Sequence, residues 1–176
     1  MKSVFYFVLC LFLFFNLNKQ SSASSLTKVQ RSELSSLVVG ANEAIKNKNF
    51  EIISTYMPGR IYKEMARRLN TTEDNLRHGL LKRLRAQFGN LPAGAYHLDE
   101  KNIDYLETGN GTFYALIPTT LETKDLIIQY KTLAIFDKKQ WYLIYGGQKT
   151  LQNPVFLEIY PDFSKVHLPK ETIIKK

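Results

Sequence analysis

Apolar residues recur every three or four positions through the first part of the chain, a spacing that predicts amphipathic helices. The clearest stripe runs from Ser32 to Lys48, with apolar positions at Leu34, Leu37, Val38, Ala41, Ala44 and Ile45. Shorter stripes follow over residues 50–57 and 61–69, separated by Pro58 and Gly59, which interrupt helical backbone. Thr71 or Thr72 can cap a fourth helix ending near Phe88. Its inward positions are predicted at Leu76, Leu80, Leu84 and Phe88.

From Gly89 onward the pattern changes to that of β-strands and turns. Strands are predicted over residues 96–106, 113–121, 126–136 and 141–145, with a last one around 155–159. In the strand over 126–136, even-numbered residues from Ile128 to Phe136 share one face, and odd-numbered residues from Ile127 to Ile135 share the other. Beyond Pro161 the pattern fades into a Lys-rich tail.

Helices followed by a meander of antiparallel strands predict an α+β fold. The N-terminal helices are expected to pack on one face of an antiparallel sheet that curves around them. After a leader is removed, 153 of the 176 residues remain, a length typical of one domain. We therefore expect a single domain over residues 24–176, with its core at about 28–160 and the tail at 161–176.

The leader itself has the three regions of a secretory signal peptide. Lys2 precedes an apolar run from Val4 to Phe15, and Ser21 and Ala23 are small residues suited to a cleavage site. We therefore predict a signal peptide over residues 1–23 and a periplasmic or secreted protein. An uncleaved anchor is disfavoured because the apolar run is too short to span a bilayer, so no stable membrane anchor is expected after cleavage.

Charge and cysteine content narrow the classes of function. Removing Lys2 and Lys19 from the 24 basic residues leaves a net charge of +6 against 16 acidic ones. Basic residues over 59–85 alternate with apolar helix positions, which favours a solvated outer face over phosphate or lipid-headgroup recognition, and no nucleic-acid partner is expected. Since Cys10 is the single cysteine and lies in the leader, the mature chain has no thiol for disulfides, catalysis or metal binding.

Three features together resemble a known superfamily. They are the segment Lys48-Asn49-Phe50-Glu51 after the first helix, the sequence Tyr56-Met57-Pro58, and the strand, charged turn and Trp-containing strand over residues 130–145. This arrangement resembles the nuclear transport factor 2-like, or cystatin-like, α+β cone over most of residues 28–160. The resemblance implies a conical pocket between the helices and the sheet.

That superfamily contains isomerases and dehydratases as well as proteins that are not enzymes. In the enzymes, an Asp or His base and a hydrogen-bond donor, commonly Tyr, lie in the pocket. The candidates for the base are His97 and Asp99, two apart on the first predicted strand, although Asp99 beside Glu100 and Lys101 is more typical of an exposed position. His78 and His167 are too far apart in sequence to form a metal motif, so no metal or cofactor is expected.

Aromatic residues are the other candidates for a site, because they can line an apolar cavity with hydroxyl groups directed inward. Packing in the core is the alternative interpretation and the more frequent one. The candidates for pocket lining are Tyr56, Tyr62, Tyr114, Tyr130, Trp141 and Tyr145.

Three classes of function follow. The favoured class is a binding or interaction protein that holds a small apolar molecule in the cone. The others are a small cofactor-free isomerase or dehydratase, and a homodimeric structural or inhibitory protein that associates through the sheet.

Overall fold

The computed structural model describes residues 25–176. The predicted leader, with its cleavage site after Ala23 and its Cys10, lies outside the described residues. Within residues 25–176, no helix combines the length and the apolar character that a membrane crossing requires.

The first two helices form as the apolar spacing predicts. Helix α1 spans Lys28–Lys46 and α2 spans Phe50–Thr55. Thr27 caps α1, because its side chain accepts from the N–H of Gln30 while the Gln30 side chain accepts from the N–H of Thr27. The predicted stripe is the buried face of α1, at Leu34, Val38, Ala41 and Ala44.

Helix α3 spans Gly59–Arg68 and α4 spans Glu73–Phe88. Thr72 caps α4, since its hydroxyl accepts from the N–H of Asn75 at 3.1 Å. The predicted inward face of α4 is partly wrong. Leu81 is buried together with Leu84 and Phe88, whereas Leu76 and Leu80 are only half-buried.

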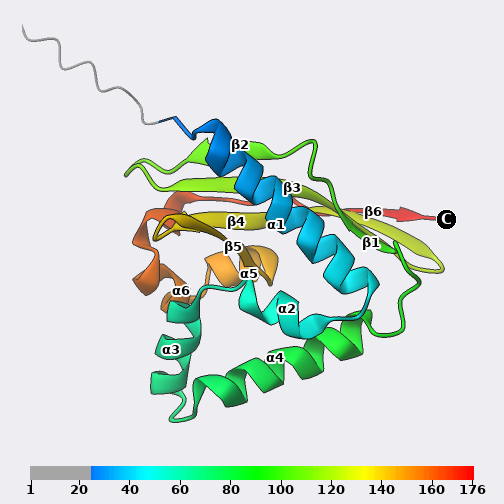
Figure 1. Cartoon of the computed structure of the whole chain (residues 1–176), viewed down its shortest axis with the longest axis horizontal. Helices are drawn as coiled ribbons and strands as arrows, with labels where there is room; N and C mark the ends of the chain where they lie inside the picture. Colours follow the sequence, from blue (N-terminus) through cyan, green and yellow to red (C-terminus); the bar gives the residue numbers. More distant parts are fainter. Residues whose placement is uncertain (1–24) are drawn as a thin grey trace, which may run out of the picture.

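The strands form one curled antiparallel sheet, and α1, α2 and α4 pack with its inner face (Figure 1). The sheet has the order β1-β3-β4-β5, with β2 also paired to β3 and β6 paired to β4. Its strands are β1 Tyr96–Leu98, β2 Asp104–Glu107, β3 Phe113–Glu122, β4 Leu126–Asp137, β5 Gln140–Ile144 and β6 Thr172–Lys175. The α+β prediction is therefore confirmed: N-terminal helices pack on a strongly curved antiparallel sheet.

The predicted strand over residues 96–106 is wrong, because the chain divides it into β1 and β2. Asp99 causes the interruption. Its carboxylate accepts from the N–H of Lys101 at 2.9 Å and from the side-chain amide of Asn102 at 2.6 Å, which closes a tight turn. The two short strands then pair with successive parts of β3.

The predicted last strand around residues 155–159 is also wrong. The segment after β5 forms α5 Gly147–Leu151, α6 Pro154–Ile159 and the 3₁₀-helix η1 Pro161–Lys165. Asn153 caps α6 by accepting from the N–H of Val155 at 2.9 Å, and Pro154 occupies the first turn. A short apolar run fits a strand or a buried helix, and here the cap decides for the helix.

This C-terminal segment covers the outer face of the sheet and extends the fold past Pro161. Phe163 is 1% exposed and packs with Phe156 and Tyr160 in a second core, which we call the outer core. The inner core lies on the opposite face of the sheet, beneath α1, α2 and α4. The sheet contributes Leu116, Leu133, Ile135 and Ile144 to the outer core. The outer face over β3, β4 and β5 is therefore occupied by the chain itself.

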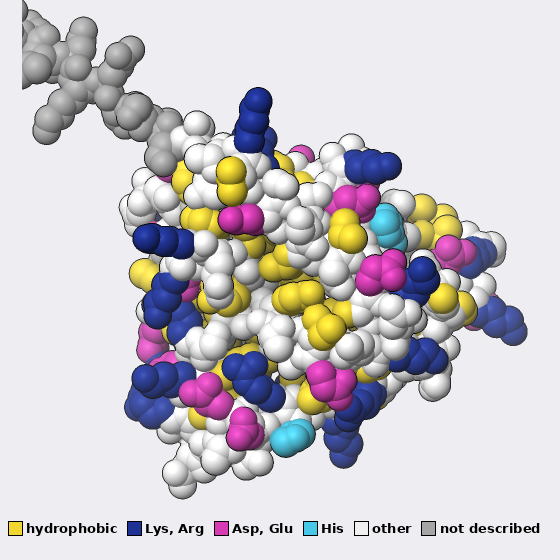
Figure 2. Space-filling view, in the orientation of Figure 1, with side chains coloured by type: hydrophobic (Ala, Val, Ile, Leu, Met, Phe, Trp, Pro, Cys, Tyr) yellow, Lys and Arg dark blue, Asp and Glu magenta, His cyan; other side chains and the backbone are white. Residues whose placement is uncertain are grey.

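Basic residues over 59–85 form ion pairs with acidic side chains and do not make one continuous positive patch. Arg85 of α4 pairs with Glu51 of α2, and Arg60 of α3 pairs with Asp137 at 3.1 Å. Figure 2 shows both signs of charge scattered over the face that α1 and α4 form. This arrangement fits a solvated surface.

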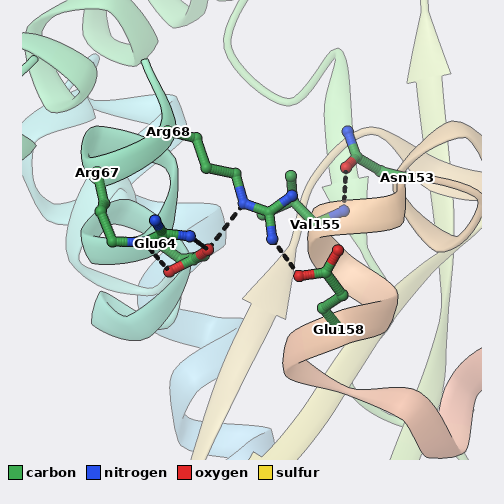
Figure 3. A network of polar contacts seen from close by, with 6 residues as sticks. All are labelled: Glu64, Arg67, Arg68, Asn153, Val155 and Glu158. Atoms are coloured by element: carbon green, nitrogen blue, oxygen red, sulfur yellow. Dashed lines mark hydrogen bonds and ion pairs between the residues drawn. The ribbon is translucent and has the colours of Figure 1, made fainter. Parts of the chain in front are cut away.

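One polar network joins α3 to α6 (Figure 3). Arg68 donates to Glu64 on its own helix at 2.7 Å and also pairs with Glu158 on α6, while Arg67 pairs with Glu64 at 2.7 Å. The hydrogen bonds from Arg67 and Arg68 lower the pKa of Glu64 to about 2. Glu64 therefore stays charged across the physiological range and orients Arg68 toward α6.

Asp162 of η1 gives the C-terminal segment a pH-dependent attachment. Its carboxylate accepts from the side-chain amide of Asn110 and the hydroxyl of Thr112, each at 2.6 Å, and these bonds lower its pKa below the ordinary 3.8. A depressed folded-state pKa contributes stability that is present above 3.8 and is lost as pH falls through the folded value. We expect Asp162→Asn to flatten the fall of Tm below about pH 4.

The control for this experiment is Asp125→Asn, since the Asp125 side chain makes no hydrogen bond or ion pair within residues 25–176. Thermal melts over the acid range compare the two variants with the parent chain. If Tm falls with decreasing pH in the same way for Asp162→Asn and the parent chain, the assigned role of Asp162 is contradicted.

Candidate binding site

The structure separates the aromatic candidates between the two faces of the sheet. Tyr56, Tyr130, Trp141 and Tyr145 pack with the inner core. Tyr62 is buried and lies near Tyr145. Tyr114 instead faces the outer core and contacts Phe163, with ring centroids 5.5 Å apart. The alternation of strand residues places Tyr114 opposite to its neighbours, so it does not share a site with the others.

A cluster of hydroxyl groups lies inside the cone, and we call it the tyrosine cluster: Tyr56, Tyr62, Tyr96, Tyr130 and Tyr145. Tyr96 joins the candidates for pocket lining, because it is buried on the first strand. Burial and the neighbouring Tyr130 raise the pKa of Tyr96 well above 10, so this phenol stays protonated. Beside it, the hydroxyls of Thr119 and Thr132 lie 2.8 Å apart in a buried hydrogen bond.

Tyr145 has the least satisfied hydroxyl of this cluster. The hydroxyl oxygen is buried and has no hydrogen-bond partner within residues 25–176. Burial, with the nearby phenols of Tyr62 and Tyr56, raises the pKa of Tyr145 far above 10. Tyr145 therefore offers a neutral hydroxyl and no proton acceptor of useful strength.

The rim of the cluster is held by α2, α3 and α4. The Tyr62 hydroxyl donates to the carbonyl of Ser54 at 3.1 Å, and Arg77 donates to the same carbonyl at 3.3 Å. The Arg77 guanidinium lies 4.0 Å from the Tyr62 ring centroid. On α1, a Cβ at Gly40 would lie 2.8 Å from the Tyr56 hydroxyl, so glycine allows Tyr56 to approach the helix.

His97 and Asp99 do not reach the cone. The exposed side chain of His97 alternates with the buried Tyr96 and Leu98, and Asp99 closes the turn after β1. Hydrogen bonds from the Asn102 side chain and the Lys101 N–H lower the pKa of Asp99, which makes it a weaker base. Among residues 25–176, the buried polar side chains other than tyrosine are Ser54, Thr108, Thr119 and Thr132.

A groove at the mouth of the cone, the rim groove, has a volume of about 360 Å³. It lies between α1, the end of α2 and the strand β5. Leu37 and Tyr56 provide apolar surface, while Glu33 on α1 and Lys139 before β5 provide opposite charges. Apolar side chains are visible between α1 and the helices below it in Figure 2. The remaining lining residues are Thr55, Gln140, Trp141 and Tyr142.

The strand wall of the rim groove is an open sheet edge. Lys138 and Lys139 have φ angles of 49° and 69° and form the two-residue turn between β4 and β5. Such a turn makes Asp137 and Gln140 a hydrogen-bonded pair, so Trp141 and Leu143 direct their backbone groups away from β4. The Leu143 N–H donates to the Tyr56 carbonyl at 2.8 Å. Within residues 25–176, the N–H and C=O of Trp141 have no such partner.

A second hollow, of about 370 Å³, lies where α3, α6 and the sheet meet. Its polar groups already satisfy one another. Asp137 accepts from Arg60 at 3.1 Å and from the Tyr160 hydroxyl at 3.0 Å, and Arg60 also donates to the Ile159 carbonyl at 3.2 Å. This hollow is therefore interpreted as part of the contact between the C-terminal segment and the sheet.

Comparisons with known proteins found no family model, no curated protein and no solved structure that matches this chain. Within residues 25–176, no three His, Cys, Asp or Glu side chains gather as metal ligands would.

The Tyr145 hydroxyl leads to a testable prediction. A buried hydroxyl without a partner destabilises the folded state, so Tyr145→Phe is expected to raise the free energy of unfolding by about 1 kcal/mol. The matched control is Tyr62→Phe, which removes the hydrogen bond to Ser54 and is expected to lower that free energy by about 1 kcal/mol. Urea melts of both variants measure the difference, and a destabilised Tyr145→Phe would show that this hydroxyl is bonded in solution.

Proposed function

We propose that this chain is an exported binding protein, a member of the nuclear transport factor 2-like superfamily, that holds a small amphipathic guest in the rim groove. The observation that carries the proposal is a groove of about 360 Å³ with apolar surface and, at Trp141, backbone groups that have no hydrogen-bond partner among residues 25–176. Ligand sites are typically concave, about 300–1,000 Å³ in volume, and lined by apolar and aromatic side chains with a few polar groups. The rim groove has each of these properties.

The charge distribution supports binding rather than catalysis. An isomerase or dehydratase of the resembled superfamily needs a base within reach of its substrate. The tyrosine cluster contributes neutral hydroxyls only, and His97 and Asp99 lie outside the cone. Glu33 lines the rim groove, but it is an exposed residue of α1 and lies outside the tyrosine cluster.

Native mass spectrometry of the protein purified from its own host tests the proposal. The expected spectrum contains the mature chain starting at Ser24 together with a complex of higher mass. Thr55→Trp fills the groove from the end of α2 and is expected to remove the complex. Ile52→Trp is the matched control, since Ile52 is exposed on the same helix and does not line the groove.

Two outcomes of this experiment oppose the proposal. A parent protein without any co-purifying molecule would leave the groove without a guest. A complex that survives Thr55→Trp unchanged would place the guest elsewhere on the molecule.

A further inference from the structure

We infer that the guest of the rim groove is a short extended peptide segment that pairs with β5 at Trp141. This inference rests on the proposed function and names the chemical class of the guest. A small apolar molecule would offer no hydrogen-bond partner to the N–H and C=O of Trp141. A peptide in extended conformation offers one acceptor and one donor at the spacing that a single strand residue needs.

The backbone already shows how such a segment fits. The Tyr56 carbonyl accepts from Leu143 and so occupies the place of a neighbouring strand at that one position. The rim groove continues along the same edge from Tyr56 toward Trp141 and Gln140. A guest segment opposite Trp141 completes the interrupted edge with two hydrogen bonds, one to the N–H and one to the C=O of Trp141. Because Leu143 is already paired, the guest spans only the positions from Lys139 to Trp141.

The wall formed by α1 selects the side chains of the guest. Glu33 and Leu37 are four residues apart and therefore neighbours on one helix face, about 5–6 Å apart between Cβ atoms. Two residues separated by one position along a strand lie on the same face about 6.6 Å apart. These spacings match, so the guest carries a basic residue and an apolar residue with one residue between them.

The charges of the groove agree with this pattern. Glu33 makes no ion pair within residues 25–176 and is open to a basic side chain of the guest. Lys139 stands on the opposite wall, at the turn before β5. The intervening guest residue points to that side, beside Gln140, and is neutral or acidic. The predicted motif is therefore basic, neutral or acidic, then apolar, in either chain direction.

A titration of the ¹⁵N-labelled protein with blocked peptides tests this inference. The probes are Ser-Lys-Thr-Leu-Ser and its reverse, Ser-Leu-Thr-Lys-Ser. At least one of them is expected to shift the backbone amide signals of Trp141 and Lys139. N-methylation of the guest residue whose N–H donates to the Trp141 carbonyl removes that hydrogen bond, and we expect binding to weaken about tenfold.

Matched variants separate the charge contribution from the backbone contribution. Glu33→Gln is expected to weaken binding several-fold and to reduce its dependence on salt. Glu43→Gln is the control, because Glu43 lies on the same helix, pairs with Lys46 at 3.7 Å and does not line the groove. Equal affinity of the N-methylated and unmodified peptides would overturn the strand pairing.

The two proposals fail in different ways. If native mass spectrometry detects a guest that Thr55→Trp removes, but neither peptide binds, the groove is a binding site and the peptide inference is wrong. If no guest is found and neither peptide shifts any signal of the groove, both proposals are wrong. Peptide binding that persists in Thr55→Trp would place the peptide outside the rim groove.

Discussion

Replacing Trp141 by alanine is expected to lower the free energy of unfolding by about 3–5 kcal/mol. Trp141 is 4% exposed, and its ring packs against Phe136 and Tyr105, with centroid distances of 5.3 and 6.3 Å. Its indole N–H also donates to the Gln30 carbonyl at 2.7 Å, which joins β5 to the first turn of α1. The substitution therefore removes apolar burial and a connection between the sheet and its covering helix. Equilibrium urea melts measure the change.

Two variants make this prediction specific. Trp141→Phe keeps most of the apolar packing and loses the indole N–H, so we expect a loss of about 1–2 kcal/mol. Val29 is 66% exposed, so the effect of Val29→Ala is expected to stay within about 0.5 kcal/mol. An alanine variant at Trp141 as stable as the parent would contradict the position of β5 beneath α1.

Trp141 also connects the fold to the binding proposal. Its side chain is part of the inner core, and the residue also lines the rim groove, where the proposed guest pairs with its backbone. Trp141→Phe keeps that backbone in place, so peptide binding is expected to survive the loss of stability. Substitutions at Trp141 therefore distinguish the side chain, which stabilises the fold, from the backbone, which contacts the guest.

Long periodic segments were predictable from the sequence because many residues repeat one signal. The stripe of α1 corresponds to its buried face, and the alternation along β4 places Thr132 and Ala134 on the inner face and Leu133 and Ile135 on the outer face. The Thr72 cap follows from local chemistry and is also confirmed. These features need no knowledge of distant contacts.

The segments that the sequence mispredicted depend on contacts that are distant along the chain or on one local hydrogen bond. The apolar run of α6 fits either a helix or a strand until Asn153 is recognised as a cap. The turn at Asp99 divides an apparently continuous strand. The strand β6 forms in the Lys-rich tail, where Ile173 and Ile174 are exposed and only pairing with β4 defines the structure.

Some residues of the rim groove were likewise predictable from the sequence, and others depend on the fold. Tyr56 and Trp141 were candidates from composition, and both line it. Glu33 and Lys139 were not, because an exposed charge carries no signal until the fold brings α1 against the β4–β5 turn. Which face of the sheet is inner also depends on packing, and Tyr114 packs in the outer core, whereas Tyr56, Tyr130, Trp141 and Tyr145 pack in the inner core.

Phe163→Ala is expected to lower the free energy of unfolding by about 3–5 kcal/mol, the range for truncating a fully buried aromatic side chain. Phe163 is 1% exposed, and its ring lies 5.5 Å from Tyr114, 5.8 Å from Phe156 and 6.1 Å from Tyr160. It therefore joins α6 and η1 to β3. The sequence pattern alone would make this residue part of a dispensable tail, for which the same substitution would have almost no effect.

The form of the transition distinguishes two ways in which the segment can be attached. Because Phe163 shares its core with Leu133 and Ile135 of β4, the segment and the sheet are expected to unfold together in one transition at lower urea. Ile173→Ala is the control, since Ile173 is 54% exposed in β6. Phe163→Ala could instead leave the main transition unchanged while proteases cleave after Tyr145. In that case the outer core stabilises only its own segment, and packing in the inner core alone stabilises the curved sheet.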